Sequence, residues 1–385
     1  MTDLTLNPNI AAAPLYVGGA AIADIQRQYS LEDIVKLASN ESPLGPSPKA
    51  IAAMQQAAAG LNRYPPIGDE ALREELARLH HLSPDNFVTG NGGCDILNML
   101  ATAFLGEGSE AAICRPTFPV YDITARRAGA GVVYVDLNPD DFGYDVEAIL
   151  AAVSPQTRLV YVCSPNNPTG STIGAAQLDA LLAHLPPHVV LVMDEVYYHF
   201  AAHHPDTLAY VRQGKNIVVL HSFSKAYGLA GLRLGYGIAP EGLAGYLSRA
   251  RLPFHLSQFT VRGGVAALQD IEHVDKGVEI VREGRGRLLA RLAELPVRAW
   301  PSEANFILFK PPFDAAEVSE RLLRRGVIVR PMGQFYLPTH LRVTIGLPAE
   351  NERFVAALAE VLAELRAEGA AVAADTGDSD GEFRF

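Results

Sequence analysis

Short apolar runs alternate with helical patterns over the middle of the chain. From about residue 87, runs rich in Val, Ile, Leu and Tyr are bounded by Gly, Pro and Asn, and they occupy 111–114, 131–136, 158–163, 189–195, 216–222 and 232–239. Segments between them, such as 145–153 and 175–185, carry apolar residues at helical spacing. Continuous apolar strands are typical of a sheet covered on both faces, and alternation of strand and helix predicts a mostly parallel α/β sheet.

The two ends of the chain follow other patterns. Residues 1–40 look extended and irregular, and then helices start at Ser47-Pro48 and at Asp69. After about residue 250 the pattern is rich in helix, with short strands near 297–300, 304–309 and 341–345 and a last helix over roughly 350–366. The pattern predicts a large α/β domain, with helices covering its sheet, and a smaller α+β domain. Their expected bounds are 41–255 and 256–367, with an arm over 1–40 that joins the smaller domain and a disordered acidic tail over 368–385.

Composition and charge narrow the class of protein. The chain has 385 residues, 49% of them hydrophobic, and a net charge of −11, with no basic patch that predicts a nucleic-acid or membrane partner. Its three cysteines are Cys94, Cys114 and Cys163, an odd and sparse set that predicts free thiols and no metal site. The N-terminus lacks the basic start of a signal peptide, and no apolar run is long enough to span a bilayer. We therefore expect a cytoplasmic protein.

A lysine and an arginine close together indicate covalent chemistry beside a phosphate. Lys225 follows an apolar strand within HSFSKAYGLAGLRLGY (221–236). A lysine alone is more often a surface residue, but Arg233 follows eight positions on. Ser222, Ser224 and Arg233 can bind a dianionic phosphate, and a desolvated lysine beside an anion is suited to bond a carbonyl carbon.

Other candidate residues follow further strands. Asp194 ends an apolar run, so it either caps a turn or is a buried carboxylate paired with a cation such as a pyridinium nitrogen. Tyr197, three residues on, can reach the same ring. SPNNPTG (164–170) predicts a turn with amides that can donate to a cofactor. TGNGGCDIL (89–97) is a glycine-rich turn entering a helix, which can bind phosphate, but it lacks the spacing of a dinucleotide site or a P-loop.

Two arginines beside apolar strands are candidates for a substrate anion. Arg330 lies in GVIVRPM and Arg342 in THLRVTIG, and each is at a strand end in this interpretation. A single arginine is usually solvated, but one beside an apolar strand is well suited to hold a carboxylate or phosphate.

Five motifs together resemble one family. NESPLGPSPKAI (40–51), NRYPP (62–66), SPNNPTG, MDEVY and SFSKAYGLAGLRLGY resemble, in order and approximate spacing, the class I/II aminotransferases of fold type I. The resemblance extends from about Tyr16 to about residue 365. It implies pyridoxal 5'-phosphate as cofactor, an amino donor and a 2-oxo acid as small-molecule partners, and a homodimer.

The resemblance also implies roles for matching residues. Lys225 matches the lysine that holds the cofactor covalently and moves a proton, and Asp194 matches the aspartate that keeps the ring nitrogen protonated; Tyr197 completes the catalytic set. The other cofactor contacts are Asn167 with Tyr197 at the ring hydroxyl, Phe118 against the ring, Gly93, Cys94, Ser222, Ser224 and Arg233 at the phosphate, and Tyr64 reaching it from the neighbouring subunit. The substrate residues are Arg342, which matches the arginine for the carboxylate or its stand-in, with Arg330, Tyr16 and Asn305 in the same pocket.

The substrate is the most open part of the interpretation. The resemblance is strongest to the branch that acts on L-histidinol phosphate, which implies amino transfer to 2-oxoglutarate in histidine biosynthesis. An aminotransferase for aromatic or other free amino acids stays open, because the stretch from Tyr16 to Ala20 lacks the proline and the basic residue usual in the family. A decarboxylase of the threonine-phosphate type stays open too, since residue identity does not decide which bond at Cα breaks. A non-catalytic regulator is disfavoured, because the first 40 residues are too few and too weakly basic for a DNA-binding domain and Lys225 is present.

Overall fold

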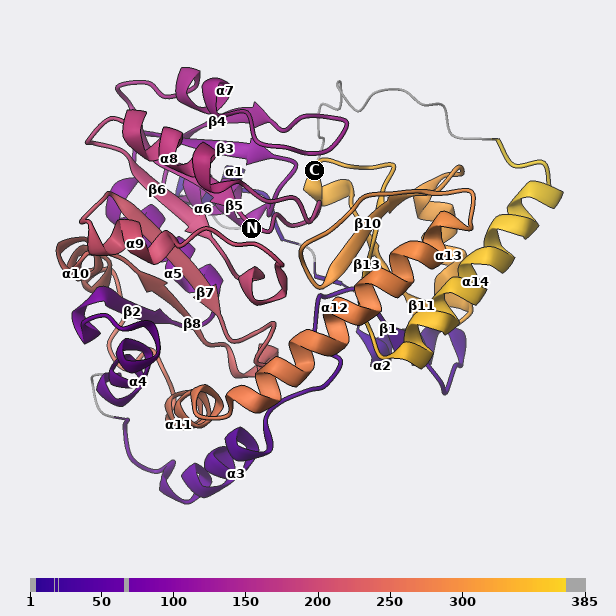
Figure 1. Ribbon diagram of the computed structural model, residues 1–385, viewed down its shortest axis with the longest axis horizontal. Helices are drawn as coiled ribbons and strands as arrows, with labels where there is room; N and C mark the ends of the chain where they lie inside the picture. Colours follow the sequence, from indigo (N-terminus) through magenta and orange to yellow (C-terminus); the bar gives the residue numbers. More distant parts are fainter. Residues whose placement is uncertain (1–4, 17, 20, 66–68, 372–385) are drawn as a thin grey trace.

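The computed structural model describes residues 5–16, 18–19, 21–65 and 69–371. Most of the predicted acidic tail, 372–385, lies outside the described residues. The chain forms a larger and a smaller part, and the long helix α12 (Ile271–Ala293) runs from one toward the other (Figure 1). None of the helices described has the length and apolar character that crossing a membrane requires.

The larger part is built on a sheet of seven strands in the order β2-β8-β7-β6-β5-β3-β4. Its strands are β2 (Phe87–Gly90), β3 (Glu110–Arg115), β4 (Gly131–Asp136), β5 (Thr157–Cys163), β6 (Val190–Asp194), β7 (Ile217–Ser222) and β8 (Gly235–Ile238). β8 runs antiparallel to its neighbours β2 and β7. The other five strands, β4, β3, β5, β6 and β7, pair in parallel. The predicted mostly parallel α/β sheet is therefore confirmed.

Helices cover both faces of this sheet, as the continuous apolar strands predict. Alternate residues of β5 point to opposite faces, so Tyr161 belongs to one buried cluster and Val160 to another. The first cluster includes residues of α5 (Gly93–Phe104), α6 (Val120–Arg127) and α10 (Glu241–Arg249). The second includes residues of α7 (Val146–Ala151), α8 (Ala175–His184) and α9 (Thr207–Arg212). The carboxyl ends of the parallel strands stay uncovered by these helices and are free to carry a site.

Three further helices pack together, and one of them, α4 (Glu70–His80), contacts β2. They are α3 (Pro48–Ala57), α4 (Glu70–His80) and α11 (Gln258–Leu268). α11 packs on α3 and α4, and glycines in it allow the close approach: a Cβ at Gly264 would lie 3.2 Å from Leu72. The predicted boundary at residue 255 stays a prediction, although α11 follows it in sequence and packs with the larger part.

The smaller part holds an antiparallel sheet in the order β12-β13-β10-β9. Its strands are β9 (Arg298–Ala299), β10 (Phe306–Lys310), β12 (Arg330–Pro331) and β13 (Leu341–Thr344), and α13 (Ala315–Arg324) and α14 (Pro348–Ala367) lie beside it. β1 (Val35–Lys36) pairs in parallel with β11 (Val327–Ile328), so the segment before residue 40 reaches the smaller part. The short 3₁₀ helices of the described chain are η1 (Ala58–Gly60), η2 (Pro84–Asn86), η3 (Tyr198–Phe200), η4 (Ala230–Leu232) and η5 (Gly333–Phe335).

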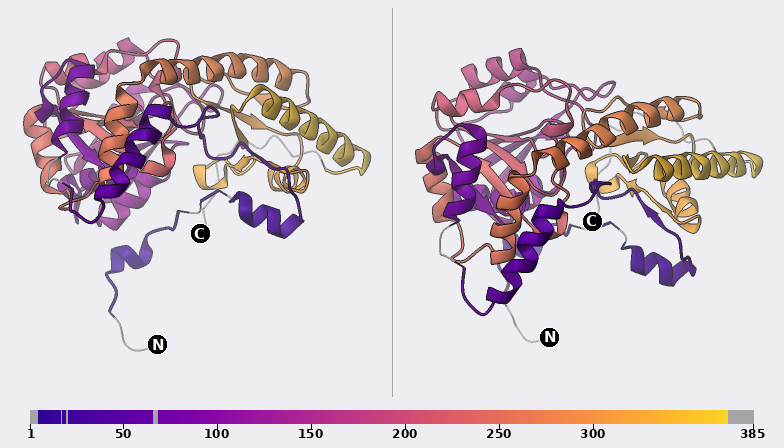
Figure 2. Two further views of the ribbon diagram at one scale, coloured as in Figure 1. Left: turned by 90° about the horizontal axis from the view of Figure 1, so that it is seen from below. Right: turned by 60° about the horizontal axis from the view of Figure 1, so that its bottom comes forward.

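The N-terminal arm leaves the smaller part and projects from the body of the molecule (Figure 2). It carries α2 (Ile22–Tyr29), which packs against the smaller part, and α1 (Pro8–Ala12), which lies near α6 of the larger part. Leu6 and Leu15 on this arm are 67% and 77% exposed. The arm therefore shows apolar side chains that the described residues of this chain leave uncovered.

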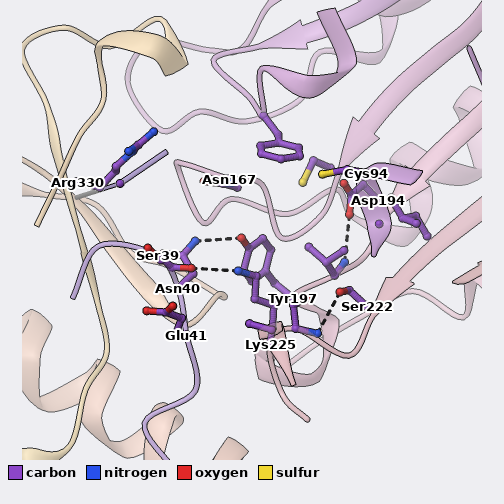
Figure 3. A pocket seen from close by; sticks show the side chains of 18 of the residues that line it. Ser39, Asn40, Glu41, Cys94, Asn167, Asp194, Tyr197, Ser222, Lys225 and Arg330 are labelled. Carbon is purple, nitrogen blue, oxygen red and sulfur yellow. Dashed lines mark hydrogen bonds between the residues drawn. The ribbon is translucent and has the colours of Figure 1, made fainter. Parts of the chain in front are cut away.

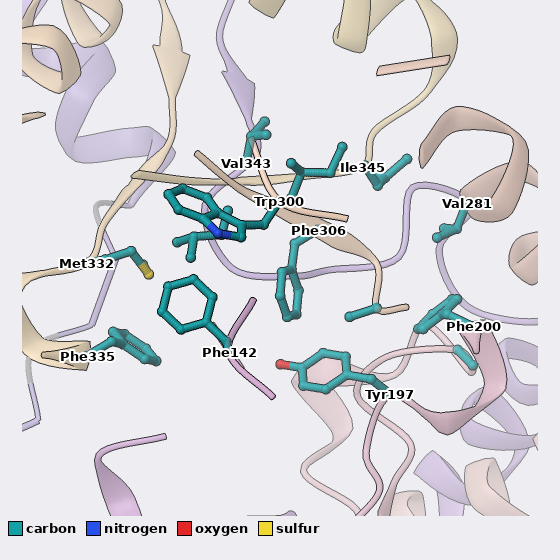
Figure 4. Close-up of a cluster of buried hydrophobic side chains, with 14 of the residues drawn as sticks. Phe142, Tyr197, Phe200, Val281, Trp300, Phe306, Met332, Phe335, Val343 and Ile345 are labelled. Carbon is teal, nitrogen blue, oxygen red and sulfur yellow. The ribbon is translucent and has the colours of Figure 1, made fainter. Parts of the chain in front are cut away.

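A packed aromatic core joins the two parts (Figure 4). Tyr197 meets Phe306 edge-on with ring centroids 5.2 Å apart, and Phe142 meets Trp300 at 5.4 Å. Burial of one such side chain contributes about 1.5–3 kcal/mol. The junction is therefore a continuous core that holds residues of both parts at fixed positions.

Candidate active site

A cavity of about 280 Å³ lies where the carboxyl ends of the parallel strands face the smaller part (Figure 3). Its walls come from the ends of β6 and β7, the start of α5, the segment 38–41, and β12 and β13. All predicted site residues except Tyr64 and Asn305 line it: Tyr16, Gly93, Cys94, Phe118, Asn167, Asp194, Tyr197, Ser222, Ser224, Lys225, Arg233, Arg330 and Arg342.

Lys225 lies in the turn that follows β7, with its amine in the cavity. The amine donates a hydrogen bond to the backbone carbonyl of Ser39 at 3.1 Å. Burial lowers the pKa of Lys225 to about 8, and the positive charges of Arg342 and Arg233 act in the same direction. Because a good fraction of this amine is neutral near pH 8, it can serve as a nucleophile and as a base.

Asp194 is the last residue of β6, and its carboxylate is buried in the cavity wall. The Tyr121 hydroxyl donates to its Oδ2 at 2.5 Å, and the backbone N–H of Val196 donates to its Oδ1 at 3.2 Å. Burial raises the pKa of Asp194 to about 6, against the effect of both hydrogen bonds. The described residues give this carboxylate hydrogen bonds but no ion pair, so its environment suits a cationic ligand.

The start of α5 and a nearby arginine form a cradle for an anion. The first N–H groups of a helix have no partners within the helix and favour negative charge. Gly92 precedes α5 with a φ of +83°, and a Cβ there would lie 2.3 Å from Nη2 of Arg233, so a larger residue would require the guanidinium to shift. Such N–H groups, hydroxyls and a guanidinium are suitable donors for a phosphate. The cavity-lining residues of the cradle are Gly93, Cys94, Ser222, Ser224 and Arg233.

Hydrogen bonds connect the other side of the cavity to the smaller part. The Tyr197 hydroxyl accepts from Nδ2 of Asn40 at 3.0 Å, and burial raises the pKa of Tyr197, so the phenol stays protonated. Arg342 donates through Nη1 to Oδ1 of Asn167 and through Nη2 to the carbonyl of Ala38 at 3.1 Å. Asn167 and Tyr197 are thereby held where their polar atoms face the cavity.

Two buried arginines stand side by side in the wall. Arg330 on β12 and Arg342 on β13 are paired residues of antiparallel strands, and Arg342 is the second residue of its strand. Burial and the charge of Arg330 lower the pKa of Arg342 to about 10. Nε of Arg342 is buried without a hydrogen-bond partner among the described residues. Neighbouring positive charges and an unused buried donor favour an anionic ligand at this point.

Aromatic rings border the cavity on a further side. Phe118 precedes α6, and its ring meets Tyr121 edge-on at 5.8 Å and Tyr16 edge-on at 6.1 Å. Tyr16 comes from the N-terminal arm and is 46% exposed. A flat ligand can therefore lie against Phe118 while Tyr16 borders the opening.

Two predicted site residues do not line the cavity. Tyr64 is 81% exposed, and its ring packs on Phe254 with centroids 4.8 Å apart. Asn305 is fully buried behind the cavity and donates to the backbone carbonyl of Asn40 at 3.0 Å. In this structure the Asn305 side chain holds the backbone behind the cavity, and its predicted contact with the substrate stays a prediction. Residues 17 and 20, in the stretch that lacks the family's usual proline and basic residue, lie outside the described residues.

The cavity also contains residues that had no role assigned from the sequence. Ser39, Asn40, Glu41 and Phe335 line it, and Tyr121 contacts Asp194 from behind. Asn40 and Glu41 begin the NESPLG segment, so their motif was the available signal. Tyr121 carried no signal, because a tyrosine among apolar helix positions has the pattern of a core residue.

The donor set fits a flat, phosphorylated ligand with a cationic ring. The cradle suits its phosphate, Asp194 suits the ring cation, and Lys225 supplies an amine of lowered pKa. Arg330 and Arg342 also line the cavity and can bind a second anionic group. Within the part of the chain that the structure describes, no group of three or more side chains is arranged to hold a metal ion.

Comparison with known proteins identifies the family. The model of aminotransferase class I and II matches residues 32–358. The chain therefore belongs to the class I and II aminotransferases and is an enzyme that transfers amino groups. The histidinol-phosphate aminotransferase of Moorella thermoacetica is 44% identical over 351 residues, which cover 90% of this chain and 90% of that protein. The histidinol-phosphate aminotransferase of Symbiobacterium thermophilum is 43% identical and covers 91% of this chain and 96% of its own length.

Solved structures agree with this assignment. The histidinol-phosphate aminotransferase of Sinorhizobium meliloti in complex with pyridoxal-5'-phosphate aligns with a TM-score of 0.84 and 28% identity, over 95% of this chain and 99% of that one. The aspartate aminotransferase of Thermus thermophilus with maleate aligns with a TM-score of 0.80 and 25% identity, over 93% of this chain and 100% of that one. The predicted aminotransferase fold type I is confirmed.

Proposed function

We propose that this enzyme uses pyridoxal 5'-phosphate to transfer the amino group of L-histidinol phosphate to 2-oxoglutarate. The observation that carries the proposal is the 41–44% identity to several histidinol-phosphate aminotransferases over nearly their whole lengths. The two buried arginines beside Lys225 agree with it, because both substrates end in an anion that arginine can bind.

The cofactor has a matching residue for each of its polar groups. Gly93, Cys94, Ser222, Ser224 and Arg233 hold its phosphate. Asp194 pairs with the ring nitrogen, Asn167 and Tyr197 hydrogen-bond the ring hydroxyl, and Phe118 packs against the ring. The buried Asp194 supports this placement, because it has no ion pair within the described chain and needs a cation to offset its burial.

The residues around the cofactor divide the chemical work. When bound, pyridoxal phosphate withdraws electrons from the substrate and makes its Cα proton acidic. Lys225 takes that proton as a base and returns it as an acid, which its lowered pKa permits near neutral pH. Asp194 keeps the positive charge on the ring nitrogen, and Tyr197 stays protonated and donates to the ring hydroxyl.

One anion site serves both halves of the reaction. Arg342, Arg330 and Tyr16 face the part of the cavity that the cofactor's contacts leave free. The phosphate of the amino donor and a carboxylate of the oxo acid bind there in turn, as a ping-pong reaction requires. Orientation by the two guanidinium groups also decides which bond at Cα is broken.

The active unit in this proposal is a cytoplasmic homodimer. Tyr64 lies 81% exposed outside its own cavity, within reach of a second copy whose cofactor phosphate it contacts. Leu61, Leu252 and Phe254 add exposed apolar surface near it, and such a patch favours a protein partner. The free thiols of Cys94, Cys114 and Cys163 support a reducing compartment.

Single half-reactions test the substrate. Cofactor-loaded enzyme is mixed separately with L-histidinol phosphate, phenylalanine, glutamate and threonine phosphate, and the cofactor absorbance is followed. We expect fast changes with L-histidinol phosphate and glutamate and a slow change with phenylalanine. Fast change with phenylalanine alone favours an aromatic or general aminotransferase, and carbon dioxide release from threonine phosphate favours a decarboxylase.

A further inference from the structure

A tyrosine that the proposed chemistry does not use contacts the proposed ring-nitrogen partner. The Tyr121 hydroxyl donates to Oδ2 of Asp194 at 2.5 Å. The phenol is 1% exposed and its pKa is raised by burial, so it is a permanent donor. Among the described residues, Tyr121 is the side chain that hydrogen-bonds this carboxylate, and the other bond comes from the backbone of Val196.

Packing fixes the position of the Tyr121 ring. It stacks on Tyr161 with centroids 4.8 Å apart and planes 13° from parallel, and it meets Phe118 edge-on at 5.8 Å. The segment before α6 is fastened as well, because Nδ2 of Asn166 donates to the carbonyl of Pro116 at 2.9 Å. The hydroxyl is therefore held at one point by contacts that do not involve Asp194.

The carboxylate needs such a donor. Asp194 is buried, and its burial favours the protonated form, which cannot pair with a ring cation. A hydrogen bond from a neutral donor stabilises the ionised form and also occupies one oxygen in a fixed direction. Asp194 lines the cavity together with Lys225 and the start of α5, so its carboxylate is available to a ligand there.

We propose that Tyr121 is a positioning residue that keeps Asp194 ionised and directs its carboxylate at the cofactor's ring nitrogen. The inference rests on the proposed function, because it presumes pyridoxal phosphate in this cavity. Tyr121 acts through Asp194 and touches neither substrate nor the reacting atoms.

Other ionisable groups also face Asp194 and bear on its response to pH. These are Cys94 of α5, Tyr144, Cys163 of β5, the adjacent Glu195, Tyr197 and Lys225. Burial raises the pKa of each of these phenols and thiols, so they stay neutral between pH 5 and 8. The charge of Glu195 raises the pKa of Asp194 and that of Lys225 lowers it, and Tyr121→Phe alters neither residue.

Tyr161 provides a matched control. It is buried, it stacks on Tyr121, and its hydroxyl makes no hydrogen bond to Asp194. Tyr161→Phe removes the same oxygen from the same ring stack without touching Asp194. A role of Tyr121 in packing alone predicts that the two phenylalanine variants behave alike.

The test measures pyridoxal phosphate dissociation constants from pH 5.5 to 8 by absorbance titration, for wild type, Y121F, Y161F, D194N and Y121F/D194N. We expect Y121F to weaken binding about tenfold near pH 6, and less at pH 8 where Asp194 is ionised without help, while Y161F stays within about twofold. In D194N, which no longer carries the charge, adding Y121F has little further effect. Thermal unfolding of the cofactor-free variants checks that each is folded.

The outcomes separate the inference from the proposed function. Equal effects of Y121F and Y161F, or a Y121F effect that persists undiminished in D194N, overturn the role of Tyr121 and leave the cofactor assignment intact. Wild type that does not bind pyridoxal phosphate overturns the proposed function. If Y121F unfolds, an analogue of pyridoxal phosphate with carbon in place of the ring nitrogen replaces it. Wild type must then lose less affinity for the analogue than for pyridoxal phosphate between pH 8 and pH 6, because protonation of Lys225 affects both ligands and protonation of Asp194 affects only the one with a ring nitrogen. An equal loss for both ligands overturns the inference.

Discussion

Replacing Gly92 with alanine tests how the chain builds its phosphate cradle. Gly92 has a φ of +83°, and a Cβ at this position would lie 2.3 Å from Nη2 and 2.9 Å from Cζ of Arg233. The new methyl group forces the guanidinium away from the start of α5. Two separate costs follow, one in the backbone and one at the anion site.

The two costs have different magnitudes and different readouts. A left-handed backbone at a residue with a Cβ costs about 1–2 kcal/mol of the free energy of unfolding. Displacing the arginine removes charge-assisted hydrogen bonds to phosphate that contribute about 1.5–3 kcal/mol, which corresponds to a loss of roughly 10- to 100-fold in cofactor affinity. Only the second cost depends on Arg233.

Gly108 isolates the backbone cost. It has a φ of +78°, and a Cβ there would meet nothing within 4 Å. Gly108→Ala is therefore expected to lower the free energy of unfolding by the same roughly 1–2 kcal/mol while leaving pyridoxal phosphate affinity unchanged. Denaturant unfolding of the cofactor-free protein and absorbance titration of the cofactor measure the two quantities separately.

A double variant decides whether the loss acts through the arginine. If Gly92→Ala weakens binding by displacing Arg233, then Gly92→Ala combined with Arg233→Gln binds no more weakly than Arg233→Gln alone, within about twofold. Additive losses, or a Gly92→Ala variant that binds like Gly108→Ala, refute the reasoning that this close approach places the guanidinium.

Further predictions concern the substrate anion, pH and assembly. Arg342→Gln is expected to raise KM about tenfold or more for both amino donor and oxo acid, because it removes a buried anion donor, and steady-state kinetics with each substrate check this; a change for one substrate alone contradicts the shared site. The free energy of unfolding should decrease as the pH falls below about 6.5, by up to about 1.4 kcal/mol per pH unit for each histidine that folding keeps neutral. Burial lowers the pKa of His80 to about 3 and also lowers that of His221, so the unfolded chain binds protons there that the folded chain does not. Urea unfolding at pH 5 to 7.5 measures this, and a stability that rises on acidification disproves it. Mixing inactive Lys225→Ala with weakened Tyr64→Ala subunits should restore about a quarter of wild-type activity if subunits exchange at random, since one cavity of each hybrid dimer is then complete. Mixtures no more active than their components contradict the contribution of Tyr64 across an interface.

The sequence determined the larger fold because its signals are local. The run 158–163 is continuously apolar and bounded by turn residues, and it forms β5 in the interior of the sheet. The sequence indicated a strand at GVIV, before Arg330, but it did not divide this stretch into β11 and β12, because strands of two residues have no period to detect. It also missed α11, whose glycines serve a close approach to α3 and therefore weaken its helical pattern.

Part of the candidate site could also be predicted from local signals in the sequence. Lys225, Asp194 and Asn167 follow strands of one sheet, so chain order and the rule that ligands bind at the carboxyl ends of strands are enough to place them together. The resemblance of their motifs to the aminotransferase family then indicated which cofactor binds there. These assignments need only residue type and the position of a strand end.

Only the tertiary structure decided which groups act on these residues. The bond from Tyr121 to Asp194 and the bond from Lys225 to the carbonyl of Ser39 join segments far apart in the chain, and the register of β12 and β13 pairs Arg330 with Arg342. Asn305 shows the reverse, since it has the residue type of a ligand contact but is fully buried behind the wall. The physical reason is that burial and distance set pKa values and hydrogen bonds, and both depend on packing between elements that no local pattern of residues records.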